Sequence, residues 1–218
     1  MPNRWKRERA RDYYHKQAKE MGYRSRAAYK LKQLNNRFHF FQGANRVLDL
    51  GAAPGGWLQV SVESTSSESI IVGVDIKEIS TIGVFNVETV IGDVKKFDTL
   101  ERIKRDYDGK FNVVLSDMAP HVSGIWELDH YKQIYLARIA LLYAKDLLSR
   151  DGWFVVKTFQ GSEHGKFVSE VKNIFKEVNI FKPKASRRKS AETYLVAHIL
   201  RGNAEFSDEF REGVHLLK

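Results

Sequence analysis

The chain has 218 residues, 43% of them hydrophobic, and a formal net charge of +9, which is typical of one globular domain with a polyanionic partner. It contains no cysteine, which excludes disulfides, thiol catalysis and cysteine-ligated zinc or iron–sulfur sites. No stretch reaches the roughly 18 apolar residues of a membrane span, and the basic start lacks the apolar core of a signal peptide, so we expect a cytoplasmic protein that does not bind membranes.

The positive charge is concentrated at the N-terminus. Residues 1–32 contain eleven lysines and arginines against three acids, so this segment carries +8 of the net +9. Aromatic residues lie among these charges, and such rings suit both stacking on unpaired bases and ordinary packing. A polyanion is the natural partner of such a segment, and a solvated helix face is the plain alternative. We expect residues 1–34 to be a basic RNA-binding helical segment, residues 35–202 the main domain, and residues 203–218 a loosely docked C-terminal tail.

The expected elements then alternate between helices and strands. Residues 3–20 form a polar helix that ends near Gly22, and residues 25–38 form a second helix with Ser25 as its N-cap. Strands are expected where short apolar runs occur, at 46–50, 70–75, 89–93, 111–117 and 152–159. Further helices are expected from residue 56 onward, over 129–149 and over 164–178. Two more strands, at 179–184 and 192–200, close the domain.

This alternation predicts βαβ units and a mainly parallel sheet with helices on both faces. The link between the last two strands is too short for a crossover helix, so these strands should pair antiparallel. We therefore predict an α/β fold with a Rossmann-like sheet of seven strands, mainly parallel, in which the last strand is antiparallel.

Acidic residues follow the predicted strands, at the edge where such sheets bind ligands. Asp49 precedes a glycine-rich loop, and Asp75, Asp93 and Asp117 end the next three strands. An acid at the place of Asp75 commonly binds ribose hydroxyls, and a carboxylate at Asp93 can accept from an adenine amino group. Each acid alone could be a solvated loop residue or a helix cap, but together they indicate an adenosine site.

The loop GAAPGG, residues 51–56, fits the pattern G-x-A-x-x-G, so a NAD-dependent enzyme is one interpretation. Its glycines let the backbone approach a ligand closely. Asp49 would repel a pyrophosphate, whereas it suits the amino-acid ammonium of S-adenosylmethionine. Together with Pro54 in the turn, it favours a methyltransferase over a dehydrogenase.

Asp117 and Lys157 end neighbouring predicted strands and should meet in one cleft. A lysine at a buried strand end needs a reason, because lysine is seldom buried without a partner. A structural salt bridge with Asp117 is one reason. A proton-handling pair is the other, in which burial and a second cation, Lys30, tune Lys157 towards a base.

Seven segments together resemble the FtsJ/RrmJ family of S-adenosylmethionine-dependent RNA ribose 2′-O-methyltransferases. They read GYRSRAAYKL, VLDLGAAPGGW, GVD, GDV, LSDMAPHVSG, FVVKTFQG and SRRKSAETYLVA, and they cover nearly the whole chain up to about residue 200. The resemblance implies a catalytic tetrad of Lys30, Asp117, Lys157 and Glu192. Two departures are visible: HVSG follows Pro120 where the family more often has Asn, and the tail after Gly202 matches no family motif.

The family's cofactor positions transfer as Gly55, Trp57, Asp75, Asp93 and Asp117. With the loop residues Asp49, Gly51, Ala53, Pro54 and Gly56, they make up the expected site for S-adenosylmethionine, whose product is S-adenosylhomocysteine. We expect no metal, because the leaving group is already a sulfonium.

Basic residues supply the expected RNA contacts. They are Arg24 and Arg26 near the N-terminus, and Lys182, Lys184, Arg187, Arg188 and Lys189 in KPKASRRKS, which leads into Glu192. The compact chain and GYRSRAAYKL resemble family members that act on a uridine of large-subunit (23S-type) rRNA, and the tRNA anticodon-loop enzymes are the alternative. Outside this class, a NAD-dependent oxidoreductase and a non-catalytic RNA-binding assembly factor remain, although the intact tetrad argues against the latter. We expect a monomer.

Overall fold

The computed structural model describes residues 13–107, 110–202, 205–208, 210 and 214. Seven strands form one sheet in the order β3-β2-β1-β4-β5-β7-β6. From β3 to β5 neighbouring strands are parallel, and β7 runs antiparallel between β5 and β6. The predicted mixed sheet is thereby confirmed. The strands are β1 (Arg46–Leu50), β2 (Ile70–Asp75), β3 (Val87–Ile91), β4 (Phe111–Ser116), β5 (Leu148–Phe159), β6 (Phe175–Phe181) and β7 (Glu192–Leu200).

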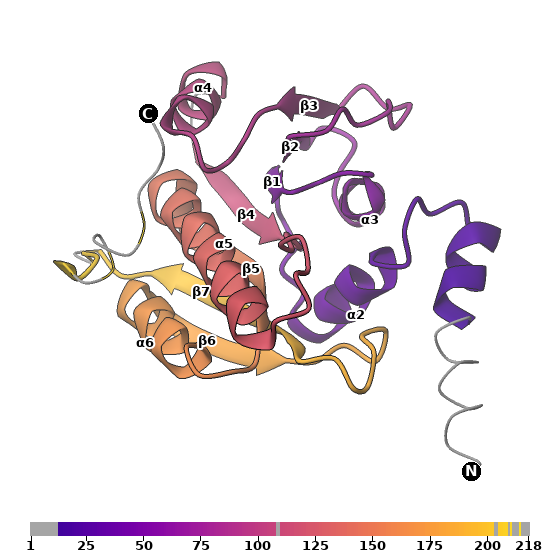
Figure 1. Cartoon of the computed structure of the whole chain (residues 1–218). Coiled ribbons are helices and arrows are strands. Elements are labelled where there is room, and N and C mark those ends of the chain that lie inside the picture. Colours follow the sequence, from indigo (N-terminus) through magenta and orange to yellow (C-terminus); the bar gives the residue numbers. More distant parts are fainter. Residues whose placement is uncertain (1–12, 108–109, 203–204, 209, 211–213, 215–218) are drawn as a thin grey trace, which may run out of the picture.

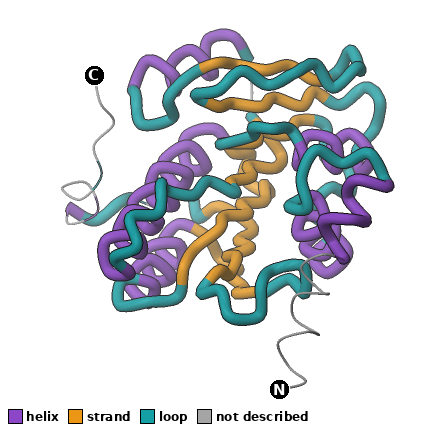
Figure 2. Tube along the Cα trace, turned by 45° about the vertical axis from the view of Figure 1, so that its right-hand side comes forward, coloured by secondary structure: helices purple, strands orange, loops and turns teal. Residues whose placement is uncertain are grey.

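Helices cover both faces of the sheet (Figures 1 and 2). One group consists of α2 (Ala28–Phe38) and α3 (Gly56–Ser64), and the other of α4 (Phe97–Asp106), α5 (Trp126–Leu147) and α6 (His164–Ile174). Side chains of the central strands alternate between the two layers, so that Val155 packs with the first group and Val156 with the second. Because both faces are covered, the central strands are continuous apolar runs.

The N-terminal segment is part of the first layer from residue 13 onward. Residues 13–20 are helical, and Ala18 and Tyr23 are buried in the same cluster as Leu31 and Leu34 of α2. The Tyr23 hydroxyl also donates to Glu63 of α3 over 2.5 Å. This segment is therefore docked on the domain, while the expected helix over residues 3–12 lies outside the described residues.

The expected helix boundaries need three corrections. Helix α5 begins at Trp126 instead of residue 129, and α6 ends at Ile174 instead of residue 178. The second difference arises because Phe175 is fully buried and pairs with Leu200, so that β6 begins there. Helix α2 has Ala27 at its N-cap without a side-chain cap, so Ser25 does not cap it.

The described part of the C-terminal tail differs from expectation in burial. Its residues Phe210 and Val214 are buried against the layer of α4, α5 and α6, which is closer packing than a loosely docked tail would have.

Helix α4 was not among the elements expected from the sequence. Within the described ranges, every helix lacks the length or the apolar character that crossing a membrane requires.

Candidate active site

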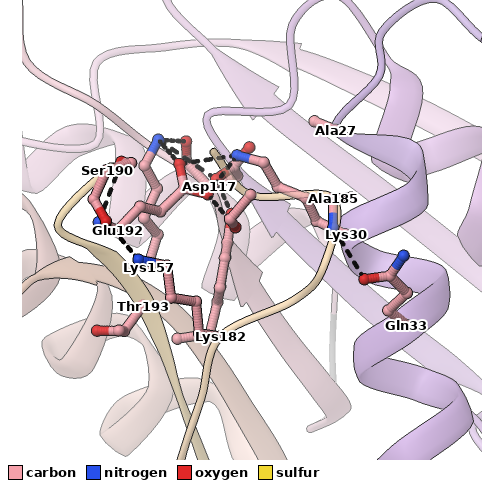
Figure 3. Close-up of polar contacts among 12 residues, drawn as sticks. Ala27, Lys30, Gln33, Asp117, Lys157, Lys182, Ala185, Ser190, Glu192 and Thr193 are labelled. Carbon is pink, nitrogen blue, oxygen red and sulfur yellow. Dashed lines mark hydrogen bonds and ion pairs between the residues drawn. The ribbon is translucent and has the colours of Figure 1, made fainter. Parts of the chain in front are cut away.

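Four predicted residues meet at the carboxyl edge of the parallel strands (Figure 3). Asp117 follows β4, and Lys157 lies near the end of the neighbouring strand β5. Strand β7 is antiparallel to β5, so its first residue, Glu192, pairs with Phe159 at the same edge. Lys30 reaches this edge from the first turn of α2. The sheet topology therefore gathers residues that are up to 162 positions apart.

The four side chains form one chain of contacts. The ammonium of Lys30 lies 2.7 and 2.8 Å from the two carboxylate oxygens of Glu192. The ammonium of Lys157 lies 3.7 Å from Glu192 and 3.4 Å from Asp117 Oδ1. Lys30, Lys157 and Glu192 are all less than 9% exposed. Two cations face two anions, and this pairing is what allows the charges to be buried.

Asp117 is held ionised by its neighbours. Burial alone would raise the pKa of its carboxyl, but Lys157 and Lys30, with a hydrogen bond from Tyr194, lower that pKa below the ordinary value. The Tyr194 hydroxyl donates to Asp117 Oδ1 over 2.6 Å. Burial and the charge of Asp117 raise the pKa of Tyr194 well above its usual range, so this hydroxyl keeps its proton.

Two hydroxyl groups in the site were missed by the sequence analysis, those of Tyr194 and Ser186. Ser186 is buried and donates to Glu192 Oε1 over 2.6 Å. Tyr194 follows Glu192 by two residues in β7, so both side chains point to one face of the strand. That spacing was a usable signal for Tyr194, but a tyrosine among apolar strand residues is equally typical of a core.

A pocket lies beside the tetrad and shares Asp117 with it. Seven of the ten expected cofactor residues line it, whereas Gly55, Asp75 and Asp93 do not. The lining consists of Ser25, Ala27, Asp49, Gly51, Ala52, Ala53, Pro54, Gly56, Trp57 and Asp117.

Two glycines of the loop are required by its conformation. Gly51 has φ +79° and Gly55 has φ +104°, and residues with a side chain rarely adopt these backbone angles. A Cβ at Gly51 would lie 2.4 Å from Met118 Cγ, and one at Gly55 would lie 2.9 Å from the Arg24 guanidinium. The loop can therefore present bare backbone to a ligand in the pocket.

Among the residues that line the pocket, Asp49 has the environment that most clearly favours a cationic ligand. It is 1% exposed, and its Oδ2 atom has no hydrogen-bond partner among the described residues. Burial, together with the negative charges of Asp117 and Asp75, raises the pKa of Asp49 well above its usual value. A cationic group in the pocket would relieve both effects, so these residues fit the ammonium and sulfonium of S-adenosylmethionine.

Three other expected cofactor residues, Asp75, Asp93 and Trp57, form hydrogen bonds to the protein backbone. Asp75 accepts hydrogen bonds from the backbone of Ala53 at 3.0 Å and of Lys77 at 2.9 Å. Asp93 accepts one from the backbone of Lys95 at 3.0 Å. The indole of Trp57 donates to the Ala27 carbonyl over 2.9 Å and ties α3 to the start of α2. Contact of Asp75 and Asp93 with the cofactor stays a prediction.

The basic loop between β6 and β7 is anchored on its inner side and charged on its outer side. Ala185 and Ser186 are buried, and the Ala185 backbone donates to Gln33 of α2 over 3.0 Å (Figure 3). Lys182 donates to the carbonyls of Arg188 and Ser190, and so holds the loop together. Lys182 is itself exposed, as are four further predicted RNA-binding residues of the loop: Lys184, Arg187, Arg188 and Lys189.

Arg24 has backbone partners that the sequence did not suggest. Its guanidinium donates to the carbonyls of Pro54 at 3.1 Å, Ser80 at 2.5 Å and Thr81 at 2.6 Å. It thereby joins the glycine loop to the loop after β2. Arg26 is half-buried, and its charge acts on Tyr194 in the site. Contact of Arg24 or Arg26 with RNA stays a prediction.

No three His, Asp or Glu side chains of the described residues are grouped to hold a metal ion.

The comparisons with known proteins agree with this geometry. Residues 23–199 match the model of the FtsJ-like methyltransferase family. A protein of Methanothrix thermoacetophila named ribosomal RNA large subunit methyltransferase E is 48% identical over 85% of this chain and 71% of its own length. One of the same name from Methanothermobacter thermautotrophicus is 39% identical over 94% of this chain and 98% of its own.

Solved structures show the same likeness. A crystal structure of a Plasmodium falciparum protein, described as a ribosomal RNA methyltransferase, superposes with a TM-score of 0.73 at 30% identity. The superposition covers 82% of this chain and 98% of that one. Human methyltransferase-like protein 13 in complex with SAH gives a TM-score of 0.55 at 15% identity, over 85% of each chain, which is a likeness of fold alone.

Proposed function

The chain belongs to the FtsJ-like methyltransferase family, and on that premise we propose that it methylates a ribose 2′-hydroxyl of large-subunit ribosomal RNA, with a uridine of 23S-type rRNA as the target. The observation that carries the proposal is the contact chain Lys30–Glu192–Lys157–Asp117 beside a pocket lined by Asp49, whose Oδ2 has no hydrogen-bond partner among the described residues. Relatives named ribosomal RNA large subunit methyltransferase E support the substrate. A NAD-dependent oxidoreductase does not agree with the family.

The tetrad provides the means to activate a hydroxyl. When bound, S-adenosylmethionine supplies an electrophilic methyl group on a sulfonium. Lys157 takes the proton from the ribose 2′-hydroxyl as that oxygen attacks, so that the proton ends on the lysine nitrogen and the methyl group on the oxygen. Lys157 has to enter this step as the neutral amine, because an ammonium has no lone pair with which to accept the proton. A well-placed base contributes about 10²–10⁴-fold to the rate.

The remaining residues position these groups. Asp117 orients Lys157 through its carboxylate and its carbonyl, both 3.4 Å from the ammonium. Lys30 and Glu192 hold the ribose and the proton network, and Ser186 links Glu192 to the exposed basic loop. Asp49 receives the amino-acid ammonium of the cofactor, while Asp75 and Asp93 receive its ribose and adenine. S-adenosylhomocysteine is the product, no metal is needed, and the enzyme acts as a cytoplasmic monomer.

Lys157→Ala tests the assignment of the base. Because the proton then has no acceptor, we expect methyl transfer to fall by at least about 10²-fold. Binding of S-adenosylhomocysteine, measured by calorimetry, should change less than about threefold, since Lys157 is outside the pocket lining. Lys176→Ala, at an exposed lysine of β6, is the matched control. A Lys157→Ala enzyme with near wild-type turnover would refute this role.

The substrate is tested by incubation of the wild-type enzyme with tritiated S-adenosylmethionine and, separately, 23S-type rRNA, large ribosomal subunits and bulk tRNA. We expect tritium in rRNA or in the subunit, at a nucleotide that resists alkaline cleavage, because 2′-O-methylation blocks attack by that oxygen. Label confined to tRNA would move the enzyme to the anticodon-loop group, and label in no RNA would contradict the proposal.

A further inference from the structure

An exposed stack of rings lies next to the catalytic lysine and has no part in the cofactor pocket. Trp126, the first residue of α5, packs face to face on His130 with ring centroids 5.9 Å apart. It also stacks on Phe159, the last residue of β5, at 6.1 Å, and both pairs are within 22° of parallel. None of these three residues lines the pocket.

The stack is held rigidly although the Trp126 side chain is partly open to solvent. His130 is 1% exposed, and its Nε2 accepts a hydrogen bond from the Glu163 backbone over 3.0 Å. Trp126, by contrast, is 46% exposed. The preceding loop is fixed as well, because Asp129 accepts hydrogen bonds from the backbones of Ser123 and Gly124. A large aromatic ring is thus presented in a fixed orientation.

The stack lies close to the lysine that is proposed to act as the base. The Lys157 ammonium lies 6.0 Å from the centre of the Phe159 ring, so the base and the exposed indole are separated by a single ring. Phe159 pairs with Glu192, the residue at which the exposed basic loop ends. Val122 and Ile125, both more than 60% exposed, lie on the loop that precedes α5.

We propose that Trp126, supported by Phe159, is a stacking platform for an unpaired nucleobase of the RNA substrate, next to the ribose presented to Lys157. This inference rests on the proposed function. A nucleobase suits the surface because a flat apolar ring lies at the edge of the sheet where Phe159 pairs with Glu192, and the exposed cations of the 182–189 loop, which leads into Glu192, can bind the neighbouring phosphates. A base must be unstacked from its neighbours to reach the indole, so the target nucleotide lies in single-stranded or locally opened RNA.

The test compares two probes of equal charge, a ten-nucleotide oligo(U) and an abasic ribose-phosphate strand of the same length. Base–aromatic stacking is worth about 1–3 kcal/mol per base, so Trp126→Ala should weaken oligo(U) binding by at least about fivefold. Its affinity for the abasic strand should stay as in the wild type. Trp126→Phe, which keeps a ring, should retain most of the oligo(U) affinity. Fluorescence anisotropy measures the affinity of the wild type and of both variants for each strand.

Leu128→Ala is the matched control, because Leu128 is 40% exposed in the same helical turn but two residues from Trp126, on another side of the helix. Unchanged binding of S-adenosylhomocysteine shows that each variant is folded. The proposal is overturned if wild-type protein binds the two strands equally, or if Trp126→Ala leaves oligo(U) binding intact or weakens both strands alike. Base-dependent binding without methylation of any RNA would refute the proposed function and leave the platform standing.

Discussion

Asp49 combines burial, a raised pKa and a pocket oxygen, Oδ2, that finds no hydrogen-bond partner in the described part of the chain. Such a group destabilises the protein without its ligand and is retained when binding requires it. The pKa of Asp49 is raised above the ordinary 3.8, so its ionisation opposes folding. The penalty is absent below the unfolded pKa and grows as the pH rises from there towards the folded pKa.

We therefore expect Asp49→Asn to raise the melting temperature of the cofactor-free protein at pH 8, and to do so less at pH 5. Its affinity for S-adenosylmethionine should fall at least about tenfold, because the amide does not neutralise the ammonium. Calorimetry measures both quantities, and Asp98→Asn at an exposed position of α4 is the control. A variant that is less stable than the wild type at pH 8, or that binds the cofactor equally well, would contradict this account of Asp49.

At the scale of single residues, the sequence predicts groups whose chemistry is unusual for their place in an element. Lys157 in an apolar strand and Asp49 before a glycine loop stand out for this reason. Ser186 and Tyr194 do not, because serine in a polar loop and tyrosine in a strand are ordinary. Their hydrogen bonds to Glu192 and Asp117 depend on how loop and strand pack, which local pattern does not contain.

At the scale of elements, β1, β2 and β7 were predicted with the bounds that the structure has, because apolar runs bounded by turns are strong signals. Strand β6 was expected at 179–184 but runs from Phe175 to Phe181. Helix α6 was predicted too long, since the run after it becomes a strand through pairing with β7. Arg24 is the clearest case of tertiary context. A surface arginine in a basic segment is typical of RNA binding, yet its guanidinium is bound to three carbonyls of two loops that flank the pocket.

Arg24→Ala removes that connection between the glycine loop and the loop after β2. Freed loops must be ordered again on binding, so we expect affinity for S-adenosylhomocysteine to fall by about 3- to 10-fold. Arg187→Ala, at an exposed arginine of the basic loop, should leave this affinity unchanged and weaken RNA binding instead. Titration calorimetry and RNA anisotropy distinguish the two. If Arg24→Ala affected RNA binding alone, Arg24 would be a phosphate contact and not a loop brace.

At the scale of the whole molecule, the charged groups of the site fall into two classes, buried ones and exposed ones. Asp49 and three members of the tetrad, Lys30, Lys157 and Glu192, are buried, where salt has little access. Arg187, Arg188 and Lys189, by contrast, lie exposed on the loop that leads into Glu192. Salt weakens interactions between exposed charges far more than those between buried ones. RNA affinity should therefore fall steeply with salt concentration, while affinity for S-adenosylhomocysteine should change little.

The slope of log affinity against log salt counts the phosphate contacts, at about 0.7 for each contact with single-stranded RNA. Replacing Arg187, Arg188 and Lys189 by alanine should reduce that slope by about 0.7 for each contact that is lost. The matched control removes three exposed cations from the opposite edge of the sheet: Arg150, Lys172 and Lys176. Both variants have the same net charge, so a general attraction of RNA to a basic protein would lower the two slopes equally. A larger change in the loop variant would instead locate the phosphate contacts beside Glu192, where they can place the target ribose.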